Sequence, residues 1–104
     1  MYVGQFSETP SNVTSFLGRQ AQFTCRLDAL NFLTWEIDSI PASNIDAARN
    51  VTFYTERTGE NEVSTLFIAA TVINNNSEII CIANYIGGNE IARTQPAFLH
   101  IQGS

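Results

Sequence analysis

Two cysteines lie far apart in the chain, and each occupies the middle of a segment in which apolar and polar residues alternate. In "QAQFTCRL" (20–27), one face carries Ala21, Phe23, Cys25 and Leu27. In "EIICIANY" (78–85), one face carries Ile79, Cys81, Ala83 and Tyr85. Alternation with a period of two predicts β-strands with one buried face. We therefore expect Cys25 and Cys81 to be buried on two separate strands.

Such a pair of cysteines has four candidate roles: a disulfide, a metal site, a nucleophile or two buried thiols. A metal site would need further ligands, and the single histidine, His100, stands alone near the C-terminus. A nucleophile would need a base, and the sequence offers none. Core-facing cysteines on separate strands suit a bridge between two sheets, which would stabilise the fold by about 4 kcal/mol. Two buried free thiols remain the alternative.

Alternation continues through much of the remaining chain. Three further segments have one apolar face each. It carries Leu33, Trp35 and Ile37 in "FLTWEID" (32–38), and Leu66, Ile68 and Ala70 in "STLFIAATV" (64–72). In "PAFLHI" (96–101) it carries Ala97, Leu99 and Ile101. Gly87-Gly88 predicts a two-residue hairpin, and "RTGEN" (57–61) predicts a second turn. Helix signals are limited to one turn in "NIDAARN" (44–50). Short strands separated by turns predict an all-β sandwich or barrel.

The composition indicates one modest globular unit. A length of 104 residues predicts a single domain over 1–104, and 44% hydrophobic with 14% charged residues is typical of a folded chain. A net charge of −5, with five Lys and Arg, argues against a nucleic-acid surface. The sequence has no apolar run of membrane-spanning length and no visible signal peptide. Met1 and Gly103-Ser104 are interpreted as cloning additions to a piece of a longer protein.

The spacing of Cys25, Trp35 and Cys81 resembles that of the immunoglobulin superfamily. The resemblance covers nearly the whole chain, because "FTC", "LTW", "STLFI", "IICIA" and "PAFLHI" are similar to strands B, C, E, F and G. It implies an immunoglobulin-like antiparallel β-sandwich with Greek-key connections, in which one disulfide joins the two sheets. Trp35 would pack against that bridge, and Leu66 and Ile79 would lie in the core.

The corner between strands E and F departs from the family pattern. The family usually has a tyrosine two residues before the second cysteine, but here that residue is Ile79, preceded by "NNNSE" (74–78). Asn and Ser side chains bond to nearby backbone, so we expect Asn74, Asn75 and Ser77 to hold the corner. The Phe-Gly-x-Gly bulge of antigen-receptor variable domains is missing as well. The chain is more similar to intermediate or variable-like domains of adhesion and recognition receptors, of junctional-adhesion-like or invertebrate cell-surface type.

The outward sides of the predicted strands differ in polarity. Segment 20–27 is polar outside, whereas the segment around Cys81 is largely apolar outside. In the immunoglobulin fold, strands C, F and G belong to one sheet. The outer face of that sheet would carry Phe32, Glu36, Ile80, Ile82, Ile86, Phe98 and His100. Five large apolar side chains on one face exceed the scatter that is normal for monomers. This face is predicted to bind a protein, with a shifted register or cover by a neighbouring domain as the alternative.

The resemblance implies a non-catalytic, extracellular module for adhesion or recognition, in a cell-surface or secreted protein. Its partner would be a second copy, giving a homodimer, or another cell-surface protein. The sequence offers no Ser-His-Asp set and no calcium loop, so we predict no enzyme activity, cofactor, metal or small-molecule substrate. The alternatives are a spacer domain in a tandem array and an intracellular, muscle-type scaffold domain with reduced cysteines.

Three N-x-[ST] sequons occur, at Asn12, Asn50 and Asn75. Each would accept a glycan in a secreted protein. All three fall near predicted strand ends or bends, where a glycan fits best. We therefore expect at least one of them to be used in the native host.

Overall fold

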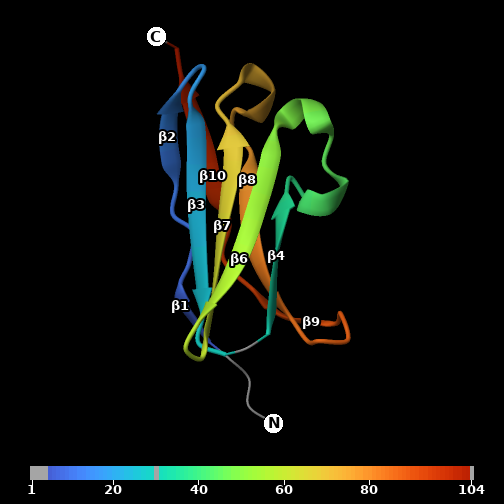
Figure 1. Cartoon of the computed structure of the whole chain (residues 1–104). Helices are drawn as coiled ribbons and strands as arrows, with labels where there is room; N and C mark the ends of the chain where they lie inside the picture. Colours follow the sequence, from blue (N-terminus) through green and yellow to red (C-terminus); the bar gives the residue numbers. More distant parts are fainter. Residues whose placement is uncertain (1–4, 30, 104) are drawn as a thin grey trace.

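A computed structural model describes residues 5–29 and 31–103, and shows two β-sheets packed face to face (Figure 1). Met1 and Ser104, both interpreted as cloning additions, lie outside the described residues. One sheet has the strand order β1 (Phe6–Glu8), β3 (Gln20–Leu27), β7 (Asn61–Ala69) and β6 (Val51–Thr58). The other has the order β2 (Val13–Phe16), β10 (Ala97–Gln102), β8 (Glu78–Asn84), β4 (Phe32–Ile37) and β5 (Ile40–Pro41), and β9 (Glu90–Arg93) pairs with β8.

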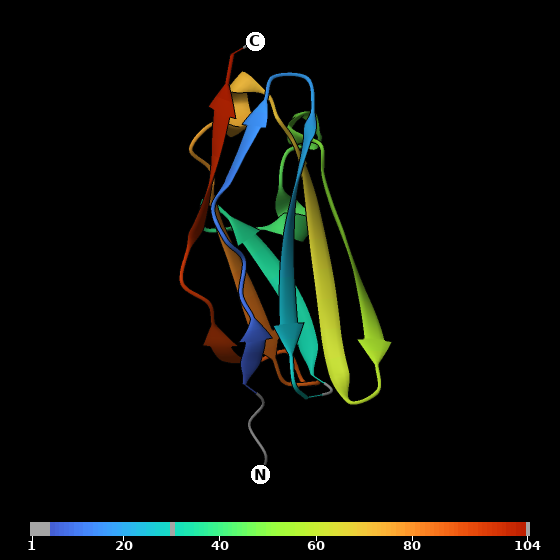
Figure 2. The same cartoon turned by 90° about the vertical axis from the view of Figure 1, so that its left-hand side faces the viewer.

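This arrangement confirms the predicted immunoglobulin-like sandwich. Turned by 90°, the two layers separate, with β3, β7 and β6 in one and β10, β8 and β4 in the other (Figure 2). The described strand pairs are antiparallel, with one exception: β2 runs parallel to β10. Three short 3-10 helices, η1 (Ala42–Asn44), η2 (Ala47–Arg49) and η3 (Val72–Asn74), lie in the connections.

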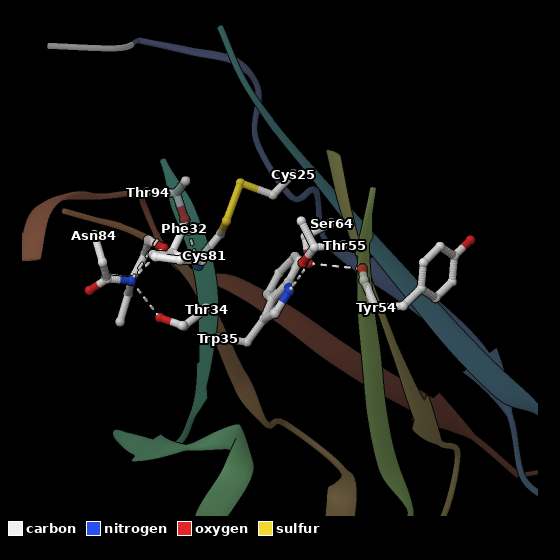
Figure 3. Close-up of a disulfide and its surroundings, with 11 residues drawn as sticks. Cys25, Phe32, Thr34, Trp35, Tyr54, Thr55, Ser64, Cys81, Asn84 and Thr94 are labelled. Atoms are coloured by element: carbon white, nitrogen blue, oxygen red, sulfur yellow. Dashed lines mark hydrogen bonds between the residues drawn. A yellow bond between two sulfur atoms is a disulfide. The ribbon is translucent and has the colours of Figure 1, made fainter. Parts of the chain in front are cut away.

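The predicted disulfide is present and joins the two sheets. Cys25 on β3 and Cys81 on β8 are bonded, with their Cα atoms 6.4 Å apart. Trp35 lies directly opposite Cys81 in the β4–β8 register and is buried. Figure 3 shows its indole reaching across the core, where Nε1 donates a 2.8 Å hydrogen bond to Ser64 Oγ on β7. Leu66 and Ile79, the other expected core residues, are also buried.

The E–F corner, between β7 and β8, is built around Asn74 and Arg49. Asn74 is completely buried, and its Nδ2 donates to the carbonyl oxygens of Arg49 and Ala69. Arg49 Nε donates to Asn74 Oδ1 over 2.7 Å, and its Nη2 donates to Ser77 Oγ and to Asp38 Oδ2. Side chains thus take the place of the tyrosine expected of the family, and one arginine connects η2, the β4–β5 turn and the corner.

The β8–β9 loop differs from the prediction of a two-residue Gly87-Gly88 hairpin. The Gly88 N–H donates to the Tyr85 carbonyl oxygen, and the Tyr85 N–H donates to that of Asn89, so the loop has three residues, 86–88. Gly88 alone of the two glycines has a positive φ, of 100°. A three-residue hairpin places glycine at its last position for this reason. The chain then forms β9, a strand that the sequence did not predict.

Candidate functional site

The candidate site is the outer face of β4, β8, β9 and β10, called here the C–F–G face. Its exposed apolar side chains lie in two separate groups. Phe32, 48% exposed, faces Asn84 at the end of β8, and Ile86, 77% exposed, follows in the β8–β9 loop. Phe98, 43% exposed, faces Glu78 at the start of β8. Asn84 lies six residues after Glu78 on β8, so Phe98 lies roughly 20 Å from Phe32 at the usual rise of a strand. His100 is exposed further along β10.

The middle of this face is not an exposed apolar surface, and here the prediction was wrong. Ile80 is 8% exposed and Ile82 is 5% exposed. In the register, Ile80 lies opposite Glu36, and Ile82 lies between Thr34 on β4 and Arg93 on β9. Glu36 and Arg93 are bonded to each other across β8, and the aliphatic parts of such long charged side chains cover apolar neighbours. β9, which carries Arg93, was not predicted from the sequence, so this cover was not expected.

A group of three charges occupies the centre of the C–F–G face. Arg93 binds Glu90 through two hydrogen bonds, Nε to Oε2 at 2.9 Å and Nη2 to Oε1 at 2.7 Å. Its Nη1 lies 3.4 Å from Glu36 Oε1 on β4. The hydrogen bond from Arg93, followed by its charge, lowers the pKa of the Glu90 carboxyl. The hydrogen bond to Glu90 raises the pKa of the Arg93 guanidinium.

Asn84 fixes the end of β8 against β4. Its Nδ2 donates to Thr34 Oγ1 over 2.9 Å, next to Phe32 (Figure 3). This bond lies on the outside of the sheet, on the opposite side from Trp35. The position of Phe32 at the strand end is thereby set by the β4–β8 register and by a side-chain bond.

A groove of about 360 Å³ lies at this end of the face. Neither Phe32 nor Ile86 lines it, but its lining includes Asn84, which pairs with Phe32, and Gly88, two residues after Ile86. Its walls come from β4, from β5 with the start of η1, from the β8–β9 hairpin and from Phe53 on β6. The lining residues are Thr34, Trp35, Glu36, Pro41, Ala42, Ser43, Phe53, Ile82, Asn84, Gly88 and Glu90. This volume lies at the lower end of the range for ligand sites. It has room for one or two side chains of a partner.

Phe32, Glu36 and Ile86 were predicted from the sequence as members of this face, whereas Glu90 and Arg93 were not. The segment "EIAR" is short, and its alternation spans four residues only. A signal for it was the hairpin itself, because a strand that follows Gly88 must pair back onto β8. Among the described residues, the structure has no cluster of His, Cys, Asp and Glu able to hold a metal ion. Nor does it contain, in that part of the chain, a helix long and apolar enough to cross a membrane.

The three sequon asparagines are exposed. Asn12 Oδ1 accepts a bond from the Phe98 N–H, and Asn75 Oδ1 accepts one from the Ile101 N–H. Both bonds use the carbonyl oxygen, whereas a glycan is attached to the amide nitrogen. Asn50 lies between η2 and β6 in a left-handed conformation, with φ of 52°.

Comparisons with known proteins identify the fold. No family model and no curated protein sequence matches the chain. Among solved structures, the Ig1–2 module of Drosophila receptor protein tyrosine phosphatase DLAR is similar over 99% of this chain and 50% of its own, with 15% identity and a TM-score of 0.73. A titin I-band fragment, I67–I69, is similar over 99% and 34% of the two chains, with 19% identity and a TM-score of 0.68.

A third similar structure is a complex between two immunoglobulin proteins, Dpr2 Ig1–Ig2 with DIP-Theta Ig1–Ig3. It matches 95% of this chain and 32% of its own, with 16% identity and a TM-score of 0.70. The chain thus spans half or less of each of these three proteins. The resemblance to the immunoglobulin superfamily is confirmed at the level of the fold.

Proposed function

We propose that the chain is a non-catalytic, extracellular protein-binding module for adhesion or recognition, which binds at the hairpin end of the C–F–G face. The observation that carries the proposal is the combination of two exposed apolar side chains, Phe32 and Ile86, with a groove lined by their neighbours Asn84 and Gly88. Apolar anchors next to a pocket, surrounded by polar groups, are typical of the centre of protein interfaces. Glu36, Glu90 and Arg93 supply such groups.

The nature of the partner follows from the same residues. A face that combines aromatic, aliphatic and arginine side chains has the composition enriched at protein interfaces. The similarity to a receptor module and to a complex of two immunoglobulin proteins supports a protein partner, either another copy of this chain or a different cell-surface protein. The Cys25–Cys81 bridge supports an oxidising compartment and argues against the intracellular scaffold alternative.

The test is a binding screen of the chain against cell-surface ectodomains, itself included. Phe32→Glu and Ile86→Glu should weaken binding by about ten-fold or more, because each places a charge in the contact. The matched controls are Phe16→Glu and Val72→Glu, since Phe16 on β2 and Val72 on η3 are 47% and 77% exposed at the other end of the molecule. A partner that ignores the first two variants would exclude this face. Lack of binding to any ectodomain would favour the spacer alternative.

N-glycosylation is the second part of this proposal. Asn12, Asn50 and Asn75 are exposed, and none of them belongs to the hairpin end of the C–F–G face. Glycans on them would leave Phe32 and Ile86 accessible. Expression in a secretory host, followed by enzymatic removal of N-glycans, should lower the mass of the chain by at least one glycan. An unchanged mass would show that the sequons are unused.

A further inference from the structure

The free edge of β6 is unlike the other sheet edges in the described part of the chain. β5 has two residues, and β1 has three with a register shift against β3. β2 and β9 have four residues each, and the β8–β9 register is shifted as well. β6, in contrast, has eight residues and pairs with β7 without interruption. Seven of its residues, all except Val51, are exposed.

The hydrogen-bond pattern shows which groups of β6 point away from the sheet. The Ala69 N–H donates to the Asn50 carbonyl oxygen over 3.3 Å, so Asn50 and Ala69 form a hydrogen-bonded pair just before β6 begins. In an antiparallel ladder such pairs recur at every second residue. The even-numbered residues of β6 therefore bond to β7. The backbone N–H and C=O groups of the odd-numbered residues face the free edge, namely Val51, Phe53, Thr55 and Arg57.

Over residues 51–55 this edge lacks the devices that keep strand edges apart, whereas Arg57 at the far end pairs with the buried Glu62. Proteins protect exposed edges with proline, bulges, inward-pointing charges or very short strands. The stretch "VTFYT" (51–55) is uncharged, free of proline and composed of β-branched and aromatic residues, which favour strand pairing. The charges of β6 are confined to Glu56 and Arg57 at its far end.

We propose that β6 pairs edge to edge with β6 of a second copy of this chain, antiparallel, around a two-fold axis at Tyr54. This register brings all four free-edge residues into hydrogen-bonded positions, with Val51 opposite Arg57 of the second copy and Phe53 opposite Thr55 of the second copy. A two-fold axis one residue further along, at Thr55, would place Val51 opposite Gly59, which lies beyond the end of β6. The register at Tyr54 therefore forms the longest ladder.

Side chains in this register are also compatible. On the outer face, Glu56 lies opposite Thr52 of the second copy, so no like charges meet. The two Tyr54 rings meet at the axis, each stacked on Phe67 of its own sheet with ring centroids 5.9 Å apart. Aromatic pairs across antiparallel strands stabilise the pairing. Phe53 also lines the groove of the proposed binding site, so a second copy at this edge would lie next to one wall of that groove. Phe32 belongs to the other sheet, so a variant at Phe32 distinguishes the two contacts.

The experiment is sedimentation velocity over a range of concentrations, on chain produced without glycans because Asn50 adjoins the contact. The wild type should form a dimer as concentration rises. Thr55→Pro removes an N–H at the free edge and not one in the β6–β7 ladder, and it should weaken the dimer by about ten-fold or more. Thr55→Val is the matched control: it also removes the hydroxyl that donates to Ser64 Oγ, but it keeps the N–H, and it should dimerise like the wild type.

Two further measurements distinguish dimerisation through β6 from dimerisation through another surface. Amide hydrogen exchange at Val51, Phe53 and Arg57 should slow as the concentration of the wild type rises. This measurement does not depend on whether a variant folds. Phe32→Glu should leave the β6 dimer unchanged, whereas it should weaken binding at the C–F–G face by about ten-fold or more. A wild type that stays monomeric, or a folded Thr55→Pro that dimerises as well as Thr55→Val, would overturn the proposal. So would a dimer whose β6 amides exchange as fast as those of the monomer.

Discussion

Arg49 and Asn74 hold each other through a reciprocal pair of hydrogen bonds. The Arg49 Nε donates to Asn74 Oδ1 over 2.7 Å, and Asn74 Nδ2 donates to the Arg49 carbonyl oxygen over 2.9 Å. Asn74 is completely buried, so its amide has no access to water as a substitute partner. The 3-10 turn that precedes β6 and the corner that precedes β8 are thus fixed to each other by one residue from each.

Replacing Asn74 should therefore destabilise the fold. Asn74→Ala leaves the Arg49 carbonyl oxygen without the Asn74 donor, whereas the Ala69 carbonyl oxygen keeps its bond from the Thr71 N–H. A buried polar group left unpaired costs roughly 1–3 kcal/mol of unfolding free energy. The measurement is the denaturant midpoint of unfolding. Asn44→Ala, at an exposed position in η1, is the control and should change stability by less than about 0.5 kcal/mol. Equal midpoints for the two variants would show that the corner is held by other contacts.

Ser64 should be equally sensitive, because it is the polar centre of the core. It accepts hydrogen bonds from Trp35 Nε1 and Thr55 Oγ1, and it donates to the Tyr54 carbonyl oxygen. Ser64→Ala leaves the buried indole N–H unpaired, at a cost of roughly 1–3 kcal/mol in unfolding free energy. Thr55→Val removes one bond from an exposed donor and should cost clearly less. A Ser64→Ala domain as stable as Thr55→Val would contradict the role given to the indole bond.

The disulfide makes a separate contribution to stability. Cys25 and Cys81 are 56 residues apart, and closing a loop of this length stabilises the folded state by about 4 kcal/mol in the chain-entropy model. Reduction, or replacement of both cysteines by alanine, should lower the denaturant midpoint accordingly. Non-reducing peptide mapping of the native protein should recover the two cysteine peptides as one linked species. Two freely alkylated thiols in air-exposed protein would contradict the bridge and favour an intracellular location.

The isoleucines of the C–F–G region should respond differently to a charge. Ile82 is 5% exposed and lies opposite Arg93, whose guanidinium already binds two carboxylates. Ile82→Glu therefore places a third carboxylate in a covered apolar position and should lower the unfolding midpoint markedly. Ile86 is 77% exposed, so Ile86→Glu should leave the circular dichroism spectrum and the unfolding midpoint nearly unchanged. An Ile82→Glu domain with an unchanged midpoint would mean that the cover over β8 opens readily in solution.

Glu90 should report on the charge group through its titration. Its pKa is lowered, first by the hydrogen bond from Arg93. Because the folded pKa lies below the unfolded value, any stability from this pair is present above the ordinary glutamate pKa of about 4.3 and is lost as the pH falls through the folded value. NMR titration of the Glu90 side chain should show the low pKa in the wild type and an ordinary one in Arg93→Gln. Identical titration curves would mean that the ion pair does not form in solution.

The sequence predicted the centre of the fold well because the relevant signals are local. The bounds of β3 coincide with the alternating segment 20–27, and β4 and β8 end one residue before their predicted limits. Each of these strands has one face in the core, so burial imposes the alternation that the sequence displays. Cys25, Trp35 and Cys81 meet because those three faces meet.

The edges of the sheets were less predictable for the same reason. β6 is exposed along nearly its whole length, so burial imposes no pattern on "VTFYTERT", and the strand was missed. β9 has four residues and was missed too, and its Arg93 explains why Ile82 is covered. The candidate site was therefore predicted at its ends, through Phe32 and Phe98, and mispredicted in its middle. Contacts between distant segments decide exposure there, and one sequence alone does not reveal them.

The parallel pairing of β2 with β10 determines how the fold would respond to mechanical force. The chain enters at one end of the sandwich with β1 and leaves at the other with β10 (Figure 1). Pulling on the two ends would draw β2 and β10 past each other along their length, loading together the backbone bonds between 13–16 and 99–102. Bonds loaded in shear must break at the same moment, whereas those of a hairpin pulled at its open end break one by one. The domain is thus arranged to resist extension along its long axis.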